Sequence, residues 1–216
     1  MGLRSTAKTA IKRALAPWRY PQPSPQLNVE RLYLYLDSLY KTRSIPGAIV
    51  EVGCFQGGTA AFAHRFLSGI GVKRRYLCID TFGGFPQDQF AADADLGTEQ
   101  FLEQSFSANS QKLVRKLLDM WNCPDVELLQ ADIVQLPADQ LPNQVAAALI
   151  DVDIAAPTKA ALEKIIPCMT PGGIILIDDC DMAGFKGARI ATEQVAPQAT
   201  YQFGMGIVTV QNSASK

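Results

Sequence analysis

Histidine, excess charge of one sign and long apolar runs are all scarce in this chain of 216 residues. A zinc site usually needs histidine ligands, and the chain has one histidine, His64, which we interpret as a packing or surface residue of a predicted helix. The formal net charge is −1, whereas a nucleic-acid surface needs concentrated Lys and Arg, so we expect no nucleic-acid partner. No apolar run approaches the roughly 20 residues of a membrane span, so we expect a cytoplasmic protein.

Paired cysteines are also missing. The five cysteines form no CxxC pair and mostly sit in or beside apolar runs, at Cys54, Cys78, Cys123, Cys168 and Cys180. This pattern is typical of buried free thiols in a reducing compartment. With 48% hydrophobic and 19% charged residues, the chain has the composition of an ordinary globular domain.

The first 26 residues differ from the rest. The stretch "MGLRSTAKTAIKRALAPWRY" carries five basic residues and no acidic one, with apolar residues at helical spacing. It predicts either a loosely docked arm or a basic amphipathic helix in peripheral contact with an anionic membrane or a partner. "PQPSPQ" at 21–26 is typical of a linker, so we expect an arm over 1–26 and one folded domain over 27–216. The choice between a monomer and a homo-oligomer stays open.

From residue 48 onward, short β-rich runs alternate with helical patterns. The runs are Ala48–Val52, Tyr76–Ile79, Val126–Leu129, Ala146–Ile150, Ile174–Ile177, Thr200–Phe203 and Ile207–Val210. Strands that alternate with helices predict a parallel sheet with helices on both faces. Only "GMG" separates the last two runs, and so short a connection permits only an antiparallel hairpin. We therefore predict an α/β, Rossmann-like domain whose seven-stranded, mostly parallel sheet ends in an antiparallel hairpin.

Carboxylates follow almost every predicted parallel strand. They are Glu51, Asp80, Asp132, Asp151, Asp153, Asp178 and Asp179. Ligands of such sheets bind beyond the carboxyl ends of the strands. Clustered anions repel one another unless a cation or a hydroxyl-rich ligand compensates them. The sequence therefore predicts a ligand site along this edge.

Three interpretations of the glycine turn in "EVGCFQGGT", residues 51–59, can be compared: a dinucleotide site, a phosphoryl-transfer site and an S-adenosylmethionine site. A dinucleotide needs G-x-G-x-x-G, but the spacing here is wrong and Glu51 would face a diphosphate. Phosphoryl transfer by Asp151 and Asp153 around magnesium would need a later Lys and a further acid pair, and would leave the glycine turn unused. S-adenosylmethionine carries a positive charge and no phosphate, and we favour it.

In this interpretation the glycine turn approaches the amino-acid part of the cofactor. Glu51 suits its cationic end, directly or through water, and Asp80 can accept both ribose hydroxyls. The adenine edge would lie at Asp132 and Ile133. The full predicted cofactor set is Glu51, Gly53, Gly57, Gly58, Thr59, Asp80, Thr81, Asp132 and Ile133. The terminal hairpin is also how the class I methyltransferase fold closes its sheet.

The cofactor leaves Asp151, Asp178 and Asp179 unexplained. The ends of neighbouring strands lie about 4.8 Å apart, so these carboxylates should converge. Oxygen-only donors suit a hard divalent ion, and Mg²⁺ keeps positions open for a vicinal diol. We predict these three residues as metal ligands, with Asp151 or Asp153 as the base that takes the hydroxyl proton.

Four stretches resemble the macrocin O-methyltransferase family: "IPGAIVEVGCFQGG", "YLCIDTFGGFP", "LIDVDIAAPTKAALEKIIPCMTPGGIILIDD" and "FKGARIAT". The resemblance covers roughly residues 45–211. It implies a magnesium-dependent methylation of sugar hydroxyls, with Asp151, Asp178 and Asp179 at the metal and Glu51 and Asp80 at the cofactor. This chain departs from the family in having Val152 between the acids, Ala-Ala-Pro at 155–157 and Cys180 after the acid pair, which removes polar groups from the acceptor side.

We therefore expect a class I, S-adenosylmethionine-dependent O-methyltransferase, assisted by Mg²⁺, that acts on a sugar or a polyhydroxylated small molecule. The segment 86–110, with Phe90, Phe101 and Phe106, and the predicted helix over 27–40 would cover the acceptor, and a buried edge helix is an equally good interpretation of 86–110. The alternative is a non-catalytic binding protein that keeps the methyltransferase fold.

Overall fold

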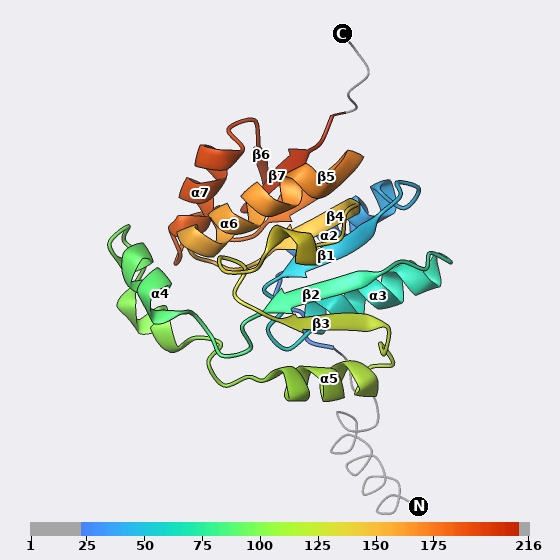
Figure 1. Ribbon diagram of the computed structural model, residues 1–216, viewed down its shortest axis with the longest axis horizontal. Helices are drawn as coiled ribbons and strands as arrows, with labels where there is room; N and C mark the ends of the chain where they lie inside the picture. The colour runs from blue at the N-terminus through green and yellow to red at the C-terminus, as the bar shows by residue number, and fades with distance from the viewer. Residues whose placement is uncertain (1–22, 212–216) are drawn as a thin grey trace, which may run out of the picture.

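The computed structural model describes residues 23–211, so the predicted basic arm up to residue 22 and its membrane contact lie outside the described residues, and of the predicted linker only residues 23–26 are described. One sheet of seven strands runs through the domain in the order β3-β2-β1-β4-β5-β7-β6 (Figure 1). The first five strands pair in parallel, whereas β7 is antiparallel to both β5 and β6. The predicted fold class and the terminal hairpin are confirmed.

The elements follow the predicted alternation closely. The strands are β1 Ala48–Val52, β2 Tyr76–Asp80, β3 Val126–Gln130, β4 Val145–Ile150, β5 Met169–Ile177, β6 Thr200–Gln202 and β7 Met205–Thr209. The α-helices are α2 Val29–Lys41, α3 Gly58–Gly69, α4 Gln87–Ala94, α5 Gln111–Met120, α6 Ala155–Ile165 and α7 Gly187–Val195. Short 3₁₀ turns lie at η1 Gln100–Gln104, η2 Ala138–Gln140 and η3 Ile166–Cys168.

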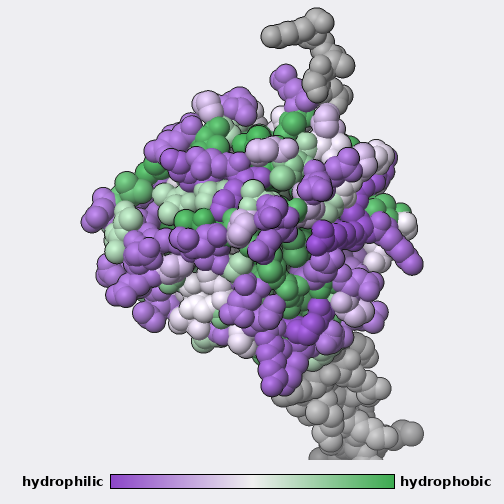
Figure 2. Space-filling model, in the orientation of Figure 1, coloured by the Kyte–Doolittle hydropathy of each residue, from purple (hydrophilic) through white to green (hydrophobic). Residues whose placement is uncertain are grey.

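Two apolar cores cover the two faces of the sheet. Helices α2, α3 and α5 pack on one face, and α6 with the loop after β3 packs on the other. Side chains of a strand alternate between faces, so Ile49 joins the first core and Val50 the second. The same alternation directs Glu51 toward the face that α2 covers. The outer face in Figure 2 is largely hydrophilic with small apolar patches, as expected for helices that bury their apolar sides.

The predicted strands needed correction at three main places. β7 begins at Met205 and not at Ile207. β5 begins at Met169 and not at Ile174, because its register against β4 shifts between Val145 and Ala147 and accommodates the Pro-Gly-Gly run as a bulge. The final hairpin turns at Phe203 and Gly204, which have φ of 53° and 81°. A two-residue turn of this kind needs positive φ at both positions, so Phe203 belongs to the turn and not to the strand.

The structure also bears on the predictions about the cysteines, about membrane spans and about the segment 86–110. All five cysteines are free, and four of them are buried, as predicted. Within residues 23–211, we find no helix with the length and apolar character that crossing a bilayer requires. The segment 86–110, predicted either as a cover over the acceptor or as a buried edge helix, forms α4 and η1.

Candidate active site

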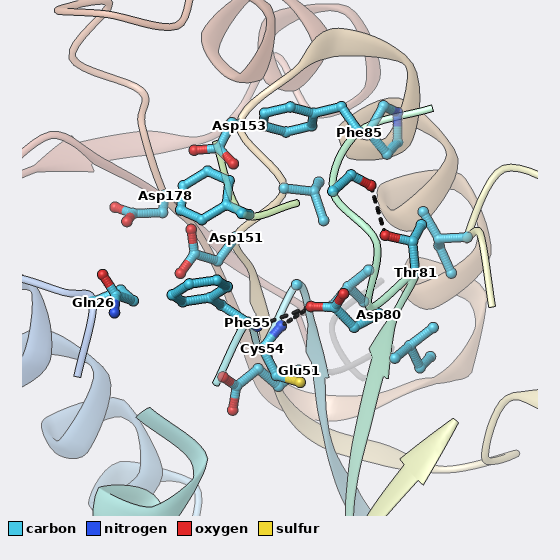
Figure 3. Close-up of a pocket in the computed structure, with 18 of the residues that line it drawn as sticks. Gln26, Glu51, Cys54, Phe55, Asp80, Thr81, Phe85, Asp151, Asp153 and Asp178 are labelled. Atoms are coloured by element: carbon cyan, nitrogen blue, oxygen red, sulfur yellow. Dashed lines mark hydrogen bonds between the residues drawn. The ribbon is translucent and has the colours of Figure 1, made fainter. Parts of the chain in front are cut away.

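A cavity of about 260 Å³ lies at the carboxyl ends of the parallel strands (Figure 3). Eleven of the thirteen predicted site residues line it: Glu51, Gly53, Thr59, Asp80, Thr81, Asp132, Ile133, Asp151, Asp153, Asp178 and Asp179. The structure therefore brings together side chains that are up to 128 residues apart in the sequence. Gly57 and Gly58 are the two predicted residues that do not line this cavity.

The glycine turn after β1 is shaped by close backbone contacts. Gly53 has a φ of +84°, and a Cβ atom there would lie 1.8 Å from the carbonyl oxygen of Asp151, so no side chain fits. A Cβ at Gly58 would lie 1.9 Å from the carbonyl oxygen of Ser24. Gly58 thus lets the chain before α2 pass over the start of α3. Gly53 faces the site, and Gly58 lies behind it.

Asp80 fastens the glycine turn to the end of β2. Its Oδ2 accepts hydrogen bonds from the backbone N–H groups of Cys54 and Phe55 at 2.8 and 2.9 Å, and its Oδ1 accepts one from Phe82 at 2.6 Å. Burial raises the pKa of Asp80, and these N–H donors oppose that shift. Since a carboxylate offers about four lone-pair sites, roughly one stays open for a ligand hydroxyl.

Glu51 is buried beside the turn, with a relative exposure of 1%. Its Oε2 accepts a hydrogen bond from the Tyr76 hydroxyl, which in turn lies 2.7 Å from the Tyr35 hydroxyl of α2. Its Oε1 has no partner within the described part of the chain. Burial raises the pKa of Glu51 to about 8. A buried carboxylate with a free oxygen on a cavity wall is suited to a cationic ligand.

Asp132 and Ile133 lie on a loop that α6 holds in place. The Lys164 ammonium donates to the carbonyl oxygens of Ile133, Val134 and Leu136 at 2.7, 2.9 and 2.8 Å. Asp132 Oδ2 accepts a 2.7 Å hydrogen bond from Nε2 of Gln89 in α4. This bond fixes the orientation of the Gln89 amide, because a carboxylate can only accept. The other amide atom, the acceptor Oε1, is buried and has no partner among the described residues.

The second group of carboxylates forms one acidic cluster, Asp151, Asp153, Asp178, Asp179 and Asp181. Oxygen atoms of Asp151, Asp153 and Asp179 lie within 4.8 Å of one another. Burial raises the pKa of Asp151 and of Asp153, and the neighbouring carboxylates add to both shifts. Burial also raises the pKa of Asp178, to about 7. Carboxylates held this close in a buried site are a fitting donor set for a hard divalent cation.

The backbone of this cluster is strained at two of its members. Asp153 and Asp179 have φ of +63° and +54°, a region that non-glycine residues seldom adopt and that Asp and Asn tolerate best. Asp153 lies in a tight turn, with a 2.6 Å hydrogen bond from the Ile154 N–H to the Val152 carbonyl. Its own carbonyl accepts from the Ala188 N–H of α7 at 3.2 Å. Such strain persists where the surroundings fix it, and it is typical of functional sites.

Arg31 of α2 places a guanidinium inside the acidic cluster. Its NH1 donates to Asp179 Oδ1 at 2.9 Å and lies 2.9 Å from Asp178 Oδ1 without an aligned hydrogen bond. Its NH2 donates to Asp181, and its Nε donates to the carbonyl of Phe203 at 3.1 Å. The side chain is 12% exposed, so these contacts are largely shielded from water. The helix α2 is thereby fastened to the end of β5 and to the β6–β7 turn.

Four phenylalanine rings form the apolar part of the cavity wall. Phe106 packs edge-on against Phe55 and Phe85, with ring centroids 5.1 and 5.7 Å apart, and Phe85 lies 5.8 Å from Phe185. Figure 3 shows Phe55 beside the carboxylate of Asp151. The predicted covering segment supplies Phe106 to this wall. Phe101 is 75% exposed and does not contribute.

Sequence reasoning missed Arg31, Tyr76, Gln89 and three of the four rings of the aromatic wall. Tyr76 carried a usable signal, because it stands two residues before the register partner of Glu51 and therefore on the same face of the sheet. Arg31 had none, since only tertiary folding brings it to Asp179. Two of the departures from the family, Val152 and Pro157, lie on the cavity wall. Cys180 lies in the core, with its Sγ 3.7 Å from Thr192 Oγ1.

The order of strands, the terminal hairpin and a site at the carboxyl ends of the strands define a class I methyltransferase fold. A sequence model of the macrocin-O-methyltransferase (TylF) family matches residues 30–202. The chain belongs to this family. Membership supports S-adenosylmethionine as the cofactor.

Relatives and solved structures agree with this assignment. The chain is 30% identical over 146 residues to 8-demethyl-8-(2,3-dimethoxy-alpha-L-rhamnosyl)-tetracenomycin-C 4'-O-methyltransferase of Streptomyces olivaceus. The matched stretch covers 62% of this chain and 53% of that protein. It is 28% identical to mycinamicin III 3''-O-methyltransferase of Micromonospora griseorubida over 62% of this chain and 56% of that one. The chain thus spans about half the length of the curated relatives it matches. In fold it resembles the O-methyltransferase NovP, with a TM-score of 0.75, 18% identity and coverage of 96% of this chain and 99% of that one.

Proposed function

We propose that this protein is an S-adenosylmethionine-dependent O-methyltransferase that methylates a hydroxyl of a sugar or of a polyhydroxylated small molecule. The observation that carries the proposal is the single cavity, whose wall joins the cofactor residues Glu51 and Asp80 to the acidic cluster. The matching relatives support it, since their names specify O-methyltransferases and one acts on a rhamnosyl-bearing tetracenomycin.

Three places in the cofactor half of the cavity would bind different parts of the cofactor. The free Oε1 of Glu51 would pair with the ammonium of the cofactor's amino-acid part. Asp80 would accept a ribose hydroxyl with its remaining lone pair, while it keeps the glycine turn in position. The adenine ring of the cofactor would lie along Ile133, where the free Oε1 of Gln89 could accept a hydrogen bond from its exocyclic amine.

The acceptor half would present a hydroxyl to the methyl donor. S-adenosylmethionine supplies the methyl group. As the new carbon–oxygen bond forms and the carbon–sulfur bond breaks, Asp151 or Asp153 would take the hydroxyl proton, and S-adenosylhomocysteine would leave. The phenylalanine wall would exclude water and hold the apolar body of the acceptor. Correct distance and angle of approach would supply much of the rate.

A divalent cation fits the acidic cluster. One guanidinium cannot compensate five carboxyl groups, and burial together with mutual repulsion raises the pKa of Asp151, Asp153 and Asp178, so a dication would stabilise their ionised forms. We propose Mg²⁺, with Asp151 and Asp179 among its ligands and Asp178 as the third ligand that the resemblance implies. When bound, Mg²⁺ would lower the pKa of a coordinated hydroxyl and orient it.

Turnover tests the proposal directly. The full chain would be incubated with Mg²⁺, methyl-labelled S-adenosylmethionine and a panel of polyhydroxylated compounds that includes deoxysugar glycosides and catechols. We expect label in at least one acceptor with an equal yield of S-adenosylhomocysteine. Tight binding of S-adenosylhomocysteine without transfer to any member of a broad panel would favour the non-catalytic alternative.

A further inference from the structure

Two tyrosine side chains bring hydroxyl groups into the apolar core between the sheet and α2. Tyr35 of α2 and Tyr76 of β2 are among the largest fully buried side chains, and both belong to this core. Burying a hydroxyl without a hydrogen-bond partner costs free energy, and phenylalanine would fill nearly the same space without that cost. The two hydroxyls therefore need an explanation other than packing.

The two hydroxyls form a chain of hydrogen bonds that ends on the carboxyl group of Glu51. Tyr76 donates to Oε2 of Glu51. Since a tyrosine hydroxyl has a single proton, Tyr76 can then only accept from Tyr35, whose hydroxyl oxygen lies 2.7 Å away. Both phenolic protons thus point toward Glu51. The hydrogen bond from Tyr76 also opposes the rise in the pKa of Glu51 that burial causes, so it favours the ionised form.

This chain leaves the other oxygen of Glu51 for a ligand. Oε1 is buried and has no partner within residues 23–211, and Glu51 lines the cavity. A buried acceptor without a donor is costly where the dielectric constant is low, and a ligand N–H group would remove that cost. The hydrogen-bond chain therefore starts in the core and ends at an oxygen that only a ligand can satisfy.

We propose that Tyr35 and Tyr76 are positioning residues, which hold Glu51 so that its Oε1 receives the ammonium of the cofactor's amino-acid part. This inference rests on the proposed function, because it concerns the S-adenosylmethionine site. Neither tyrosine lines the cavity, so both act through Glu51 and not by contact with the cofactor.

The fold fixes the place of Tyr35 from both ends of α2. Arg31 lies four residues before Tyr35, on the same face of the helix, and its Nε donates to the carbonyl of Phe203 at 3.1 Å. Beyond the other end of the helix, Arg74 donates to the carbonyl of Arg43 at 2.8 Å. The hydroxyl of Tyr35 is therefore held against Tyr76 before any ligand binds.

Calorimetry with two ligands tests the role of the tyrosines without turnover. S-adenosylhomocysteine carries the amino-acid part, whereas 5'-methylthioadenosine has the same nucleoside and lacks that part. On the full chain, we expect Tyr76→Phe to weaken S-adenosylhomocysteine binding at least tenfold. Tyr35→Phe should weaken it about three- to fivefold, because Tyr35 acts one hydrogen bond further away. The affinity for 5'-methylthioadenosine should change less than twofold in both variants.

Tyr33→Phe is the matched control, because it removes a hydroxyl from the exposed side of the same helix. It should leave both affinities unchanged. If the hydroxyls of Tyr35 and Tyr76 only stabilised the fold, their loss would lower the melting temperature and weaken the two ligands equally.

A double-mutant cycle with Glu51→Gln gives a second measurement, which needs S-adenosylhomocysteine alone. In the Glu51→Gln background, Tyr76→Phe should weaken binding less than threefold, because no carboxylate remains for the hydroxyl to hold. This cycle decides the question even if 5'-methylthioadenosine binds too weakly to be measured.

Three results would overturn the inference: unchanged S-adenosylhomocysteine affinity in both tyrosine variants, equal losses for the two ligands, or the same loss from Tyr76→Phe with Glu and with Gln at position 51. Any of these, together with normal S-adenosylhomocysteine binding by the natural sequence, rejects the role of the tyrosines alone. Absence of S-adenosylhomocysteine binding by the natural sequence rejects the proposed function.

Discussion

Two acceptor side chains in the cofactor half of the site, Glu51 and Gln89, are each held by a hydrogen bond from another element. Tyr76 of β2 fixes one oxygen of Glu51 and leaves the other free. Gln89 of α4 is oriented by Asp132 in the same manner. The free oxygens of Glu51 and Gln89 are buried hydrogen-bond acceptors without a donor. A ligand that carries N–H donors would satisfy both of them.

Protonation of Glu51 should make cofactor affinity depend on pH. Its pKa is raised to about 8 by burial, so at neutral pH most of the free protein carries a neutral Glu51. Pairing with an ammonium requires the ionised form. Between pH 6 and 8 the affinity for S-adenosylhomocysteine should therefore rise with pH, by at most about tenfold per unit. Calorimetric titration at several pH values measures this dependence.

Glu51→Gln is the control for that prediction. Gln keeps an acceptor for the Tyr76 hydroxyl but cannot ionise, so its affinity should be lower at pH 8 and nearly independent of pH. The same pH slope in the Gln variant would show that another group causes it.

The carboxylates of the site could be predicted from the sequence because each follows a strand, and the ends of parallel strands meet at one edge. Arg31 could not, since 148 residues separate it from Asp179 and its helix gives no local sign of the contact. Likewise, the sequence places Asp153 and Asp178 equally well at strand ends, and only the coordinates put one of them beside the guanidinium.

At the scale of elements, the loops that carry the site are held by polar groups from neighbouring helices. Lys164 of α6 binds three carbonyls of the loop after β3, and Asp93 of α4 accepts a 2.6 Å hydrogen bond from the Ala155 N–H at the start of α6. These contacts explain why loops on either side of the cavity are fixed before a ligand binds.

Lys164→Met should loosen the loop that carries Asp132 and Ile133. Three part-buried carbonyl groups would lose a charged donor, and we expect a loss of about 1–3 kcal/mol in the free energy of unfolding. Affinity for S-adenosylhomocysteine should fall as well. Chemical denaturation and calorimetry measure the two effects, and Lys159→Met on the exposed side of α6 is the control that should leave both unchanged.

Asp93→Ala should separate α4 from α6. Asp93 is 1% exposed and also accepts from the Thr98 hydroxyl, so its removal leaves both donors without their partner. We expect a loss of about 1–3 kcal/mol in the free energy of unfolding. An equal loss from Asp88→Ala, an exposed acid in the first turn of α4, would contradict a specific role for Asp93.

Elements differ in how well their sequence predicts them. The central strands were predictable because short apolar runs bounded by turns alternate with helical patterns along the chain. α4 was predicted only as one of two alternatives because it has mixed polarity and no side-chain cap at its start, and its place depends on Gln89 and Asp93 contacts with distant loops. β5 was predicted too short because its Pro-Gly-Gly run forms a bulge and does not end the strand.

At the scale of the whole molecule, the cavity consists of two halves with different chemistry. The ends of β1 and β2 offer groups suited to a sulfonium nucleoside, and the ends of β4 and β5 offer the acidic cluster. Arg31 links α2 to the β6–β7 hairpin across the second half. The two halves should therefore respond separately to chemical perturbation.

A chelator of divalent cations would distinguish the two halves of the cavity. Removal of divalent cations should abolish methyl transfer, because the acceptor hydroxyl loses its activation, while the affinity for S-adenosylhomocysteine should change less than about threefold. Turnover and calorimetry on the same sample, with excess Mg²⁺ added back as the control, measure both. Full activity in the chelator would contradict the metal site.

The central claim is that the carboxylates at the strand ends form a site for S-adenosylmethionine. Calorimetric titration of the full chain with S-adenosylhomocysteine, compared between the natural sequence and Asp80→Ala, tests it most directly. We predict saturable one-to-one binding that weakens at least tenfold in the variant, provided that circular dichroism shows it folded. No binding by the natural sequence, or the same affinity in both proteins, would contradict the claim.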